Sequence, residues 1–387
     1  MKTIVIAGGG YGGIHLLKGL KREFKNMIGK EIRIILVDRN QYHFRKVLLF
    51  KEIIGSSDLK IPYEKYCGDS AEFIQGEILS VQKNENNLLI LKDGKHEFIS
   101  YDYLIMALGS EIREVSSELG GISLRNIESA RMIRKQIFEK LNEQSGKRLL
   151  NISIVGAGIT GIETAASIAD WLRKETGFVH NIVLINSEGR LLPLLPKTFV
   201  KKIEKQLGKL GIRVEQGKRV ERYVNERIEF RNHSAIPADI CIWTNGMIPN
   251  PLIGKLGFKT DCKGSVTVNS FYQIEGESDI YALGDNALIR DPKTGEIAGM
   301  TCKEAIDQAG RLSKIMKQDL KGKQKLSHKH HFDFYCISLG NEKGIVWMKP
   351  FGLNFFITGR LGGKIRQLTW DLASIISEVG CLWKNCN

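Results

Sequence analysis

The chain begins with two apolar runs separated by a glycine cluster and an amphipathic segment. Residues 3–7 are apolar at nearly every position and predict a buried strand, whereas the apolar positions of residues 14–24 recur at helical spacing. Residues 33–37 form a second apolar run that ends at Asp38. A strand, a helix and a strand in this order are typical of a βαβ unit in a parallel sheet.

The same order begins again at Asn151. Residues 152–155 predict a strand, residues 162–173 a helix, and residues 181–185 a second strand that ends at Asn186. The number of residues from Gly13 to Asp38 equals the number from Gly161 to Asn186. The sequence therefore predicts one construction used twice, which differs from the short tandem repeats of a solenoid.

The rest of the chain gives weaker signals. Alternating apolar and polar positions predict antiparallel strands at residues 80–91 and 97–106. Residues 127–141 predict a helix, and a polar stretch at 144–147 indicates a boundary. Residues 314–331 are polar and basic and predict a linker before a C-terminal module. Further strands are expected at residues 211–214, 227–230 and 279–283.

Length and composition describe a folded protein of more than one domain. The chain has 387 residues, of which 42% are apolar and 26% charged, so two or three domains are expected. With 57 Lys and Arg against 43 Asp and Glu, the formal charge is +14, which favours an anionic partner such as a nucleotide or an acidic lipid surface. Nucleic acid is not the predicted partner, because no module combines aromatic and basic residues.

Cysteine spacing and hydropathy indicate the compartment. The seven cysteines show neither C-x-x-C spacing nor the dense framework of a small secreted domain, which favours a reducing compartment. The chain contains no uncharged apolar run of about 18 residues, and its N-terminal apolar run is too short for a signal peptide. We therefore expect a cytoplasmic protein without a membrane-spanning helix.

The first glycine cluster matches the G-x-G-x-x-G fingerprint of dinucleotide-binding units. Gly8 would form the tight turn, Gly10 would let the backbone approach a pyrophosphate, and Gly13 would let the helix pack on the strand. A glycine cluster can also form a tight turn of the chain without binding any ligand. Here a strand precedes it, a helix follows it, and Asp38 ends the next strand, where its carboxylate can bind ribose hydroxyls. This context favours dinucleotide binding.

A second fingerprint, Gly156, Gly158 and Gly161, lies in the same strand-to-helix setting and predicts a second dinucleotide. The position that corresponds to Asp38 is Asn186, which can bind a ribose but lacks the charge that would repel a 2′-phosphate. Glu163 would lie near an entering nicotinamide, although a carboxylate there more often interacts with the start of a helix.

Five further segments resemble the two-dinucleotide flavoprotein oxidoreductases of the pyridine nucleotide-disulfide oxidoreductase superfamily. They are residues 101–110 (YDYLIMALGS), 243–250 (WTNGMIPN), 279–285 (DIYALGD), 37–43 (VDRNQYH) and 48–50 (LLF). The last two segments are most similar to type II NADH dehydrogenases, and the resemblance covers about residues 1–310.

The resemblance implies an α/β protein with two doubly wound, Rossmann-like domains. An FAD domain of residues 1–112 and 245–327 would contain the inserted NAD(P)H domain, residues 113–244, and residues 328–387 would form a small C-terminal module. FAD would take a hydride from NAD(P)H, so no side chain is predicted to act as a catalytic acid or base, and no metal site is predicted. The predicted cofactor-binding residues are Gly8, Gly10, Tyr11, Gly12, Gly13, Asp38, Arg39, Ala107, Gly109, Gly156, Gly158, Thr160, Gly161, Glu163, Asn186, Gly246, Gly284 and Asp285.

Departures from the family pattern concern the electron acceptor. Residues 42–47 contain no cysteine, so a dithiol relay of the disulfide branch is not expected. Cys302 and Cys336 could reach a flavin, as cysteines do in sulfide:quinone reductases, but small buried thiols are the favoured interpretation. Type II dehydrogenases carry two glutamines where this chain has Lys303 and Asp307, which are spaced for an i,i+4 ion pair or would alter the acceptor site. Val47 replaces their usual proline.

Residues 363–383 show apolar positions at helical spacing, flanked by Lys364, Arg366 and Lys384. This helix would either pack on its own domain or lie on an anionic membrane surface, for example the inner face of the cell membrane. A short histidine-rich tract, residues 328–331, is interpreted as a solvated loop.

The sequence thus predicts an FAD-dependent NAD(P)H dehydrogenase that takes electrons from NADH and passes them to an acceptor, with a quinone favoured. Two alternatives remain at this stage. One is a flavoprotein reductase of a soluble acceptor or small redox protein, and the other is a flavin redox sensor that cycles slowly.

Overall fold

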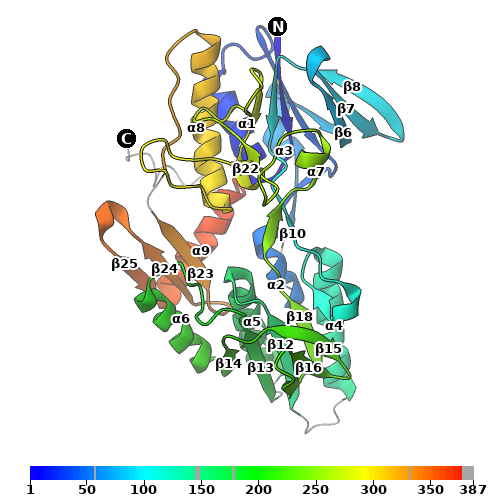
Figure 1. Ribbon diagram of the computed structural model, residues 1–387, viewed down its shortest axis with the longest axis vertical. Helices are drawn as coiled ribbons and strands as arrows, with labels where there is room; N and C mark the ends of the chain where they lie inside the picture. The colour runs from blue at the N-terminus through cyan, green and yellow to red at the C-terminus, as the bar shows by residue number, and fades with distance from the viewer. Residues whose placement is uncertain (56–57, 144–148, 177–178, 331–332, 377–387) are drawn as a thin grey trace.

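The computed structural model describes residues 1–55, 58–143, 149–176, 179–330 and 333–376. Within these residues, two five-stranded parallel sheets form the centres of two α/β units, one above the other in Figure 1. A third, smaller sheet of antiparallel strands lies beside them and is formed by the last part of the described chain.

The first parallel sheet has the strand order β21-β9-β1-β2-β5. Its strands are β1 (Lys2–Ala7), β2 (Ile32–Asp38), β5 (Glu72–Gln75), β9 (Tyr103–Met106) and β21 (Ile280–Ala282). Because β21 comes from a much later part of the chain, the second unit is inserted between β9 and β21. Two helices, α1 (Tyr11–Glu23) and α8 (Cys302–Leu320), pack against each other beside this sheet.

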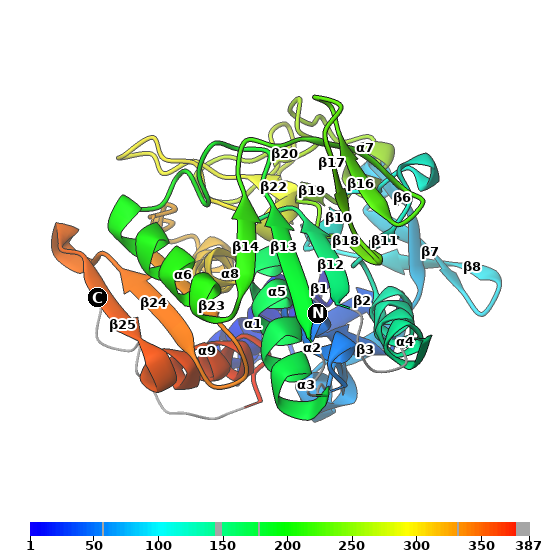
Figure 2. The same cartoon turned by 90° about the horizontal axis from the view of Figure 1, so that it is seen from below.

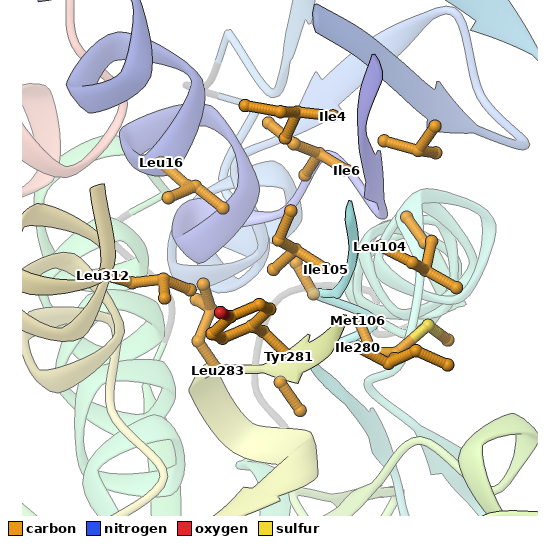
Figure 3. Packing of buried hydrophobic residues seen from close by; sticks show 14 of the residues in the cluster. Ile4, Ile6, Leu16, Leu104, Ile105, Met106, Ile280, Tyr281, Leu283 and Leu312 are labelled. Atoms are coloured by element: carbon orange, nitrogen blue, oxygen red, sulfur yellow. The ribbon is translucent and has the colours of Figure 1, made fainter. Parts of the chain in front are cut away.

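The centre of this unit is a buried hydrophobic core. The strands are apolar at nearly every position because both faces of the sheet are covered, as is usual for a parallel sheet. Figure 3 shows Ile4, Ile105 and Tyr281 from three neighbouring strands, with Leu16 of α1 and Leu312 of α8 at the same core. All of these side chains are essentially inaccessible to solvent.

Short antiparallel strands and helices surround the first sheet. A three-stranded meander, β6-β7-β8, covers the side of the sheet opposite α1 and α8 (Figure 1). The two chain segments that connect the units pair as β10 and β19. The bounds are β3 (Tyr42–Phe44), α2 (Leu49–Ile53), β4 (Lys60–Pro62), α3 (Glu64–Cys67), β6 (Glu77–Gln82), β7 (Asn87–Lys92), β8 (Lys95–Ser100), β10 (Ser110–Ile112), β19 (Met247–Pro249), α7 (Leu252–Lys255), β20 (Val266–Thr267) and β22 (Ala287–Leu288).

The second parallel sheet has the strand order β11-β18-β12-β13-β14. It repeats the strand–glycine turn–helix construction of the first sheet at its own centre. The bounds are β11 (Ile122–Ser123), α4 (Ile127–Glu143), β12 (Leu150–Val155), α5 (Ile159–Trp171), β13 (His180–Ile185), α6 (Lys197–Lys209), β14 (Ile212–Glu215), β15 (Val220–Val224), β16 (Arg227–Phe230), β17 (Ala235–Pro237) and β18 (Ile240–Trp243).

The C-terminal part consists of β23 (Phe334–Ser338), β24 (Gly344–Met348), β25 (Phe355–Thr358) and α9 (Gly359–Ala373). Figure 2 shows α6 on one side of this small sheet and α9 on the other. Trp347 and Trp370 belong to the same buried cluster as the core of the second unit, and so does Phe50 of α2. One continuous core therefore joins the C-terminal part, the second unit and a helix of the first unit.

Two expectations from the sequence are wrong. Residues 103–106 were expected to extend an antiparallel pair, but β9 lies in the middle of the first parallel sheet, between β1 and β21. The linker expected at residues 314–331 begins later, because α8 continues to Leu320. Leu312, Ile315 and Met316 keep one face of α8 in the core while its lysines lie on the other face.

The C-terminal tracts also differ from expectation. His328, placed in a solvated loop by the sequence, is buried, and its Nδ1 lies 2.8 Å from the Tyr272 hydroxyl. The predicted helix of residues 363–383 begins earlier, at Gly359, and its regular part ends at Ala373. Residues 377–383, the last part of the predicted helix, lie outside the described residues. The same is true of His331 and of the predicted boundary at residues 144–147.

Candidate active site

The two glycine turns have nearly the same backbone geometry. Gly8 and Gly156 have φ angles of 110° and 107°, in the region that favours glycine. The N–H of each turn's first glycine donates to a carbonyl near the end of the following strand: Gly8 to Val37 at 2.8 Å and Gly156 to Ile185 at 3.0 Å. The duplication seen in the sequence is thus a duplication of structure.

The remaining glycines of each turn divide into close-packed and open positions. A Cβ on Gly13 would collide with the Gly8 carbonyl, and one on Gly161 with the Gly156 carbonyl, because each helix packs directly on its turn. In contrast, a Cβ on Gly10 or Gly158 would meet no atom within 4 Å. Open space therefore lies in front of the second glycine of both turns.

This open space is suited to a phosphate group. Gly10 and Gly158 are the N-cap residues of α1 and α5, and neither helix has an acidic residue in its first turn. The free N–H groups and the positive end of each helix dipole thus face a space that any larger side chain would fill. Both turns fit the pyrophosphate of a dinucleotide.

The residues that end the second strands differ between the two turns. The Asp38 carboxylate accepts hydrogen bonds from the N–H groups of Gly9 and Asn40, both at 2.8 Å, which fixes it beside the first turn. Asn186 is buried, and its side-chain amide donates to the Glu188 carbonyl at 3.0 Å. At this position, therefore, the first turn has a negatively charged group for ribose hydroxyls and the second turn has a neutral amide.

A single cavity of about 550 Å³ extends from the first glycine turn to the start of α5. Thr160 and Thr244 of the second unit line one end of it, and Asp38 and Arg39 line the other. The predicted site residues that line the cavity are Gly8, Gly10, Tyr11, Gly12, Asp38, Arg39, Ala107, Gly109, Thr160, Gly284 and Asp285. Those that lie outside its lining are Gly13, Gly156, Gly158, Gly161, Glu163, Asn186 and Gly246.

Three polar side chains form a network in the middle of the cavity. The Ser110 hydroxyl donates to the Asp285 carboxylate at 2.6 Å, and the Lys46 ammonium donates to the Ser110 carbonyl at 2.8 Å. Burial raises the pKa of Asp285, and the Ser110 bond and Lys46 oppose that rise. Burial lowers the pKa of Lys46. The network can hold hydroxyl groups of a ligand, which fits the ribityl chain of FAD.

Lys46 and Ser110 were not among the residues predicted from the sequence to form a site. Lys46 lies on a short helical turn after β3, and a lysine between Arg45 and Val47 gives no pattern of its own. Lys46 is half-buried, and its place in the site follows only from β10 and the loop after β21, which lie next to it. Asn286, which is fully buried and accepts from the Gly109 N–H at 3.0 Å, was missed for the same reason.

Glu163 is held by the C-terminal helix. Its carboxylate accepts from both the Nε and a terminal nitrogen of Arg366, at 2.9 and 3.1 Å, and from the Ser338 N–H at 2.8 Å. Burial alone would lower the pKa of Arg366, but the adjacent carboxylate raises it above its ordinary value. The pair ties α5, β23 and α9 together. A contact of Glu163 with NAD(P)H stays a prediction.

The start of α8 carries the residues that depart from the family pattern. Cys302 and Met300 line the cavity, and Lys303 forms an i,i+4 ion pair with Asp307 at 3.1 Å. The ion pair that the spacing of Lys303 and Asp307 predicted is therefore present. Among the described residues, no group of three or more histidine, cysteine or acidic side chains could hold a metal ion.

We expect Cys302→Ser and Cys336→Ser variants to keep flavin reduction by NADH and acceptor turnover within a few-fold of the parent protein. Burial raises the pKa of the Cys302 thiol and raises that of Cys336 to about 12, so neither is a thiolate at neutral pH. Stopped-flow reduction and steady-state assays check this. Loss of turnover with FAD still bound would assign a redox role to that cysteine.

Comparisons with known proteins agree with this site. The family model of the pyridine nucleotide-disulphide oxidoreductases matches residues 2–309. The chain therefore belongs to this family, and it is an NADH dehydrogenase-type oxidoreductase that uses FAD and NAD(P)H. The two predicted dinucleotide units and the predicted fold class are confirmed at this level.

Three relatives illustrate the similarity. The NADH dehydrogenase-like protein YutJ of Bacillus subtilis is 26% identical over 79% of this chain and 82% of its own length. Demethylphylloquinone reductase NdbB of Synechocystis is 26% identical over 95% of this chain and 91% of its own. The structure of NDH2 from Plasmodium falciparum in complex with NADH has a TM-score of 0.81 at 17% identity, covering 96% of this chain and 94% of that one. That last similarity concerns the fold.

Proposed function

We propose that this protein oxidises NADH and passes the electrons to a quinone. FAD supplies the hydride-accepting chemistry when bound. The side chains of this chain hold and orient the two dinucleotides: the first glycine turn, Asp38 and Asp285 would bind FAD, and the second glycine turn would bind NAD(P)H. The single observation that carries the proposal is the cavity that runs from the first glycine turn to Thr160, in the first turn of the helix that follows the second glycine turn.

The quinone is favoured over a soluble acceptor by two observations. A relative that covers nearly the whole chain is a quinone reductase by name. In addition, the cavity wall includes apolar side chains, among them Phe44, Phe50 and Met300, which suit a hydrophobic acceptor. The replacement of the family's two glutamines by Lys303 and Asp307 instead favours the alternative, a soluble acceptor.

An acceptor screen distinguishes these functions. Purified protein with FAD would be supplied with NADH and with short-chain quinones, oxygen, ferricyanide or small redox proteins. The proposal expects the highest kcat/KM with a quinone. A higher value with a redox protein would favour the soluble acceptor, and reduction of the flavin without turnover by any acceptor would favour a sensor.

The second site suggests relaxed coenzyme selectivity. Asn186 lacks the charge that would repel the 2′-phosphate of NADPH, so we expect Asn186→Asp to raise the NADH over NADPH ratio of kcat/KM by about tenfold, or about 1.4 kcal/mol. Asn181→Asp at the start of the same strand is the control, because it adds the same charge far from the turn. An unchanged ratio in Asn186→Asp would mean that this residue does not face the ribose.

We further propose a cytoplasmic protein that associates with the inner face of the cell membrane. No helix within the described ranges has the length and apolar character to cross a bilayer. The basic balance of +14 supports attraction to anionic lipid. Of the flanking basic residues considered for α9, however, Arg366 is buried against Glu163 and does not face outward. Lys364 is exposed, so the described part of α9 keeps only part of the basic flank that the sequence indicated.

A further inference from the structure

The tip of the β24–β25 hairpin exposes three large apolar side chains. Phe351 is 98% exposed, Leu353 63% and Phe355 49%. We call these three residues the hairpin tip. A soluble protein exposes single apolar side chains commonly, but three within five residues on one turn indicate a contact surface.

The backbone holds the hairpin tip in this form. Phe351 has φ 53° and ψ 27°, a left-handed conformation that is unfavourable for a bulky residue. The turn is closed by the Leu353 N–H, which donates to the Pro350 carbonyl at 3.0 Å, and the Trp347 indole donates to the Asn354 side chain at 2.8 Å. The exposed ring of Phe351 therefore lies on a turn that backbone and side-chain hydrogen bonds hold in place.

Lysines of α6 lie near β25, the strand that follows the turn of the hairpin. The Lys202 ammonium lies 5.7 Å from the ring centroid of Phe356, the residue that follows Phe355, and Phe199 of α6 stacks on the same ring. Exposed lysines 201 and 205 flank Lys202 on α6, and Lys349 begins the turn itself. Figure 2 shows α6 and β25 side by side at one edge of the molecule.

Acidic groups do not cancel this charge. Asp333 lies at the base of the hairpin, where its carbonyl accepts from the Lys349 N–H, but the four lysines 201, 202, 205 and 349 outnumber Asp333 and Glu204. The one acidic residue of α6, Glu204, is directed toward Gln216, which donates to it at 3.0 Å. The surface therefore combines the protruding apolar side chains of the hairpin tip with an excess of positive charge from Lys349 and the lysines of α6.

We propose that the hairpin tip inserts into the headgroup region of an anionic lipid bilayer while the α6 lysines bind its surface. This rests on the membrane association proposed above and assigns its contact surface. A bilayer accepts protruding apolar side chains without a matching pocket, whereas a protein partner would need one. Lysines near an anionic surface add attraction that falls with salt.

The test is co-sedimentation of the full-length, FAD-loaded protein with vesicles of neutral lipid alone or mixed with anionic lipid. We expect the double variant Phe351→Ser, Leu353→Ser to reduce binding to anionic vesicles by about tenfold or more, because it removes two apolar side chains that insertion into the bilayer would bury. Phe98→Ser is the matched control: Phe98 is 56% exposed on β8, on the opposite side of the molecule in Figure 1, and its loss should leave binding unchanged.

A charge series tests the second part of the surface. Changing lysines 201, 202 and 205 to Gln should weaken binding and flatten its salt dependence. The same change at the exposed lysines 30, 65 and 95 keeps the total charge equal and should have little effect. Turnover with a water-soluble short-chain quinone, measured without vesicles, should be unchanged in every variant.

Several outcomes overturn the proposal. One is a parent protein that does not bind anionic vesicles, and another is equal binding by the tip variants and the Phe98 control. Concentration-dependent self-association that is lost in the tip variant would make this surface an interface between copies. In each case the turnover with the short-chain quinone tells separately whether the proposed reaction itself holds.

Discussion

We expect the Arg366→Ala variant to lose about 3 to 5 kcal/mol of unfolding free energy, the range for removing one partner of a buried ion pair. The side chains of Arg366 and Glu163 are only 13% and 3% exposed, so the variant would leave the Glu163 carboxylate charged and buried. That carboxylate links α5, β23 and α9. Denaturant unfolding followed by tryptophan fluorescence measures the loss.

Two variants show whether the charge itself is responsible. Arg360→Ala removes an exposed arginine from the same helix, paired with Glu342, and should cost no more than about 1 kcal/mol. The double variant Glu163→Gln, Arg366→Met removes both buried charges and should recover part of the stability lost in Arg366→Ala. If Arg366→Ala and Arg360→Ala unfold at the same denaturant concentration, the buried pair is not what fixes α9.

The second large effect is expected from the open glycines. Gly10→Val should weaken FAD binding by a hundredfold or more, about 3 kcal/mol, because the side chain would fill the space in front of the helix N-terminus. Gly10 has a φ of −67°, which valine adopts easily, so the protein should still fold, with a loss of about 1 kcal/mol from the changed N-cap. Flavin release and fluorescence titration measure the binding.

Gly158→Val provides the matched variant at the second turn. Its backbone has φ −71° and ψ −177°, nearly the same as Gly10, and its Cβ also meets no atom within 4 Å. This variant should keep FAD and the yellow colour but lose reduction by NADH. Loss of FAD from Gly158→Val, or its retention by Gly10→Val, would reverse the assignment of the two dinucleotides to the two turns.

The sequence predicted the two βαβ units well because their signals are local. Strands such as β1 and β12 are apolar at nearly every position, and the spacing of the glycines follows from the close approach of helix and strand at Gly13 and Gly161. The resemblance then supplied the order of the remaining segments. Eleven of the predicted cofactor-binding residues line the cavity.

The features that were missed depend on contacts between distant parts of the chain. Arg366 appeared as one basic residue on an amphipathic helix, and nothing in its neighbourhood showed that a carboxylate from α5 would cover it. The histidine tract looked solvated because its composition is polar, whereas His328 pairs with Tyr272 in the interior. Lys46 became a cavity residue only through β10 and the loop after β21.

Anaerobic mixing of the purified, FAD-loaded protein with NADH tests the central claim most directly. The account predicts that the flavin absorbance bleaches in a single turnover and returns when a quinone is added, whereas the Gly158→Val variant stays oxidised after the same addition of NADH. A protein that cannot be reconstituted with FAD, or a bound flavin that NADH does not reduce, would contradict it.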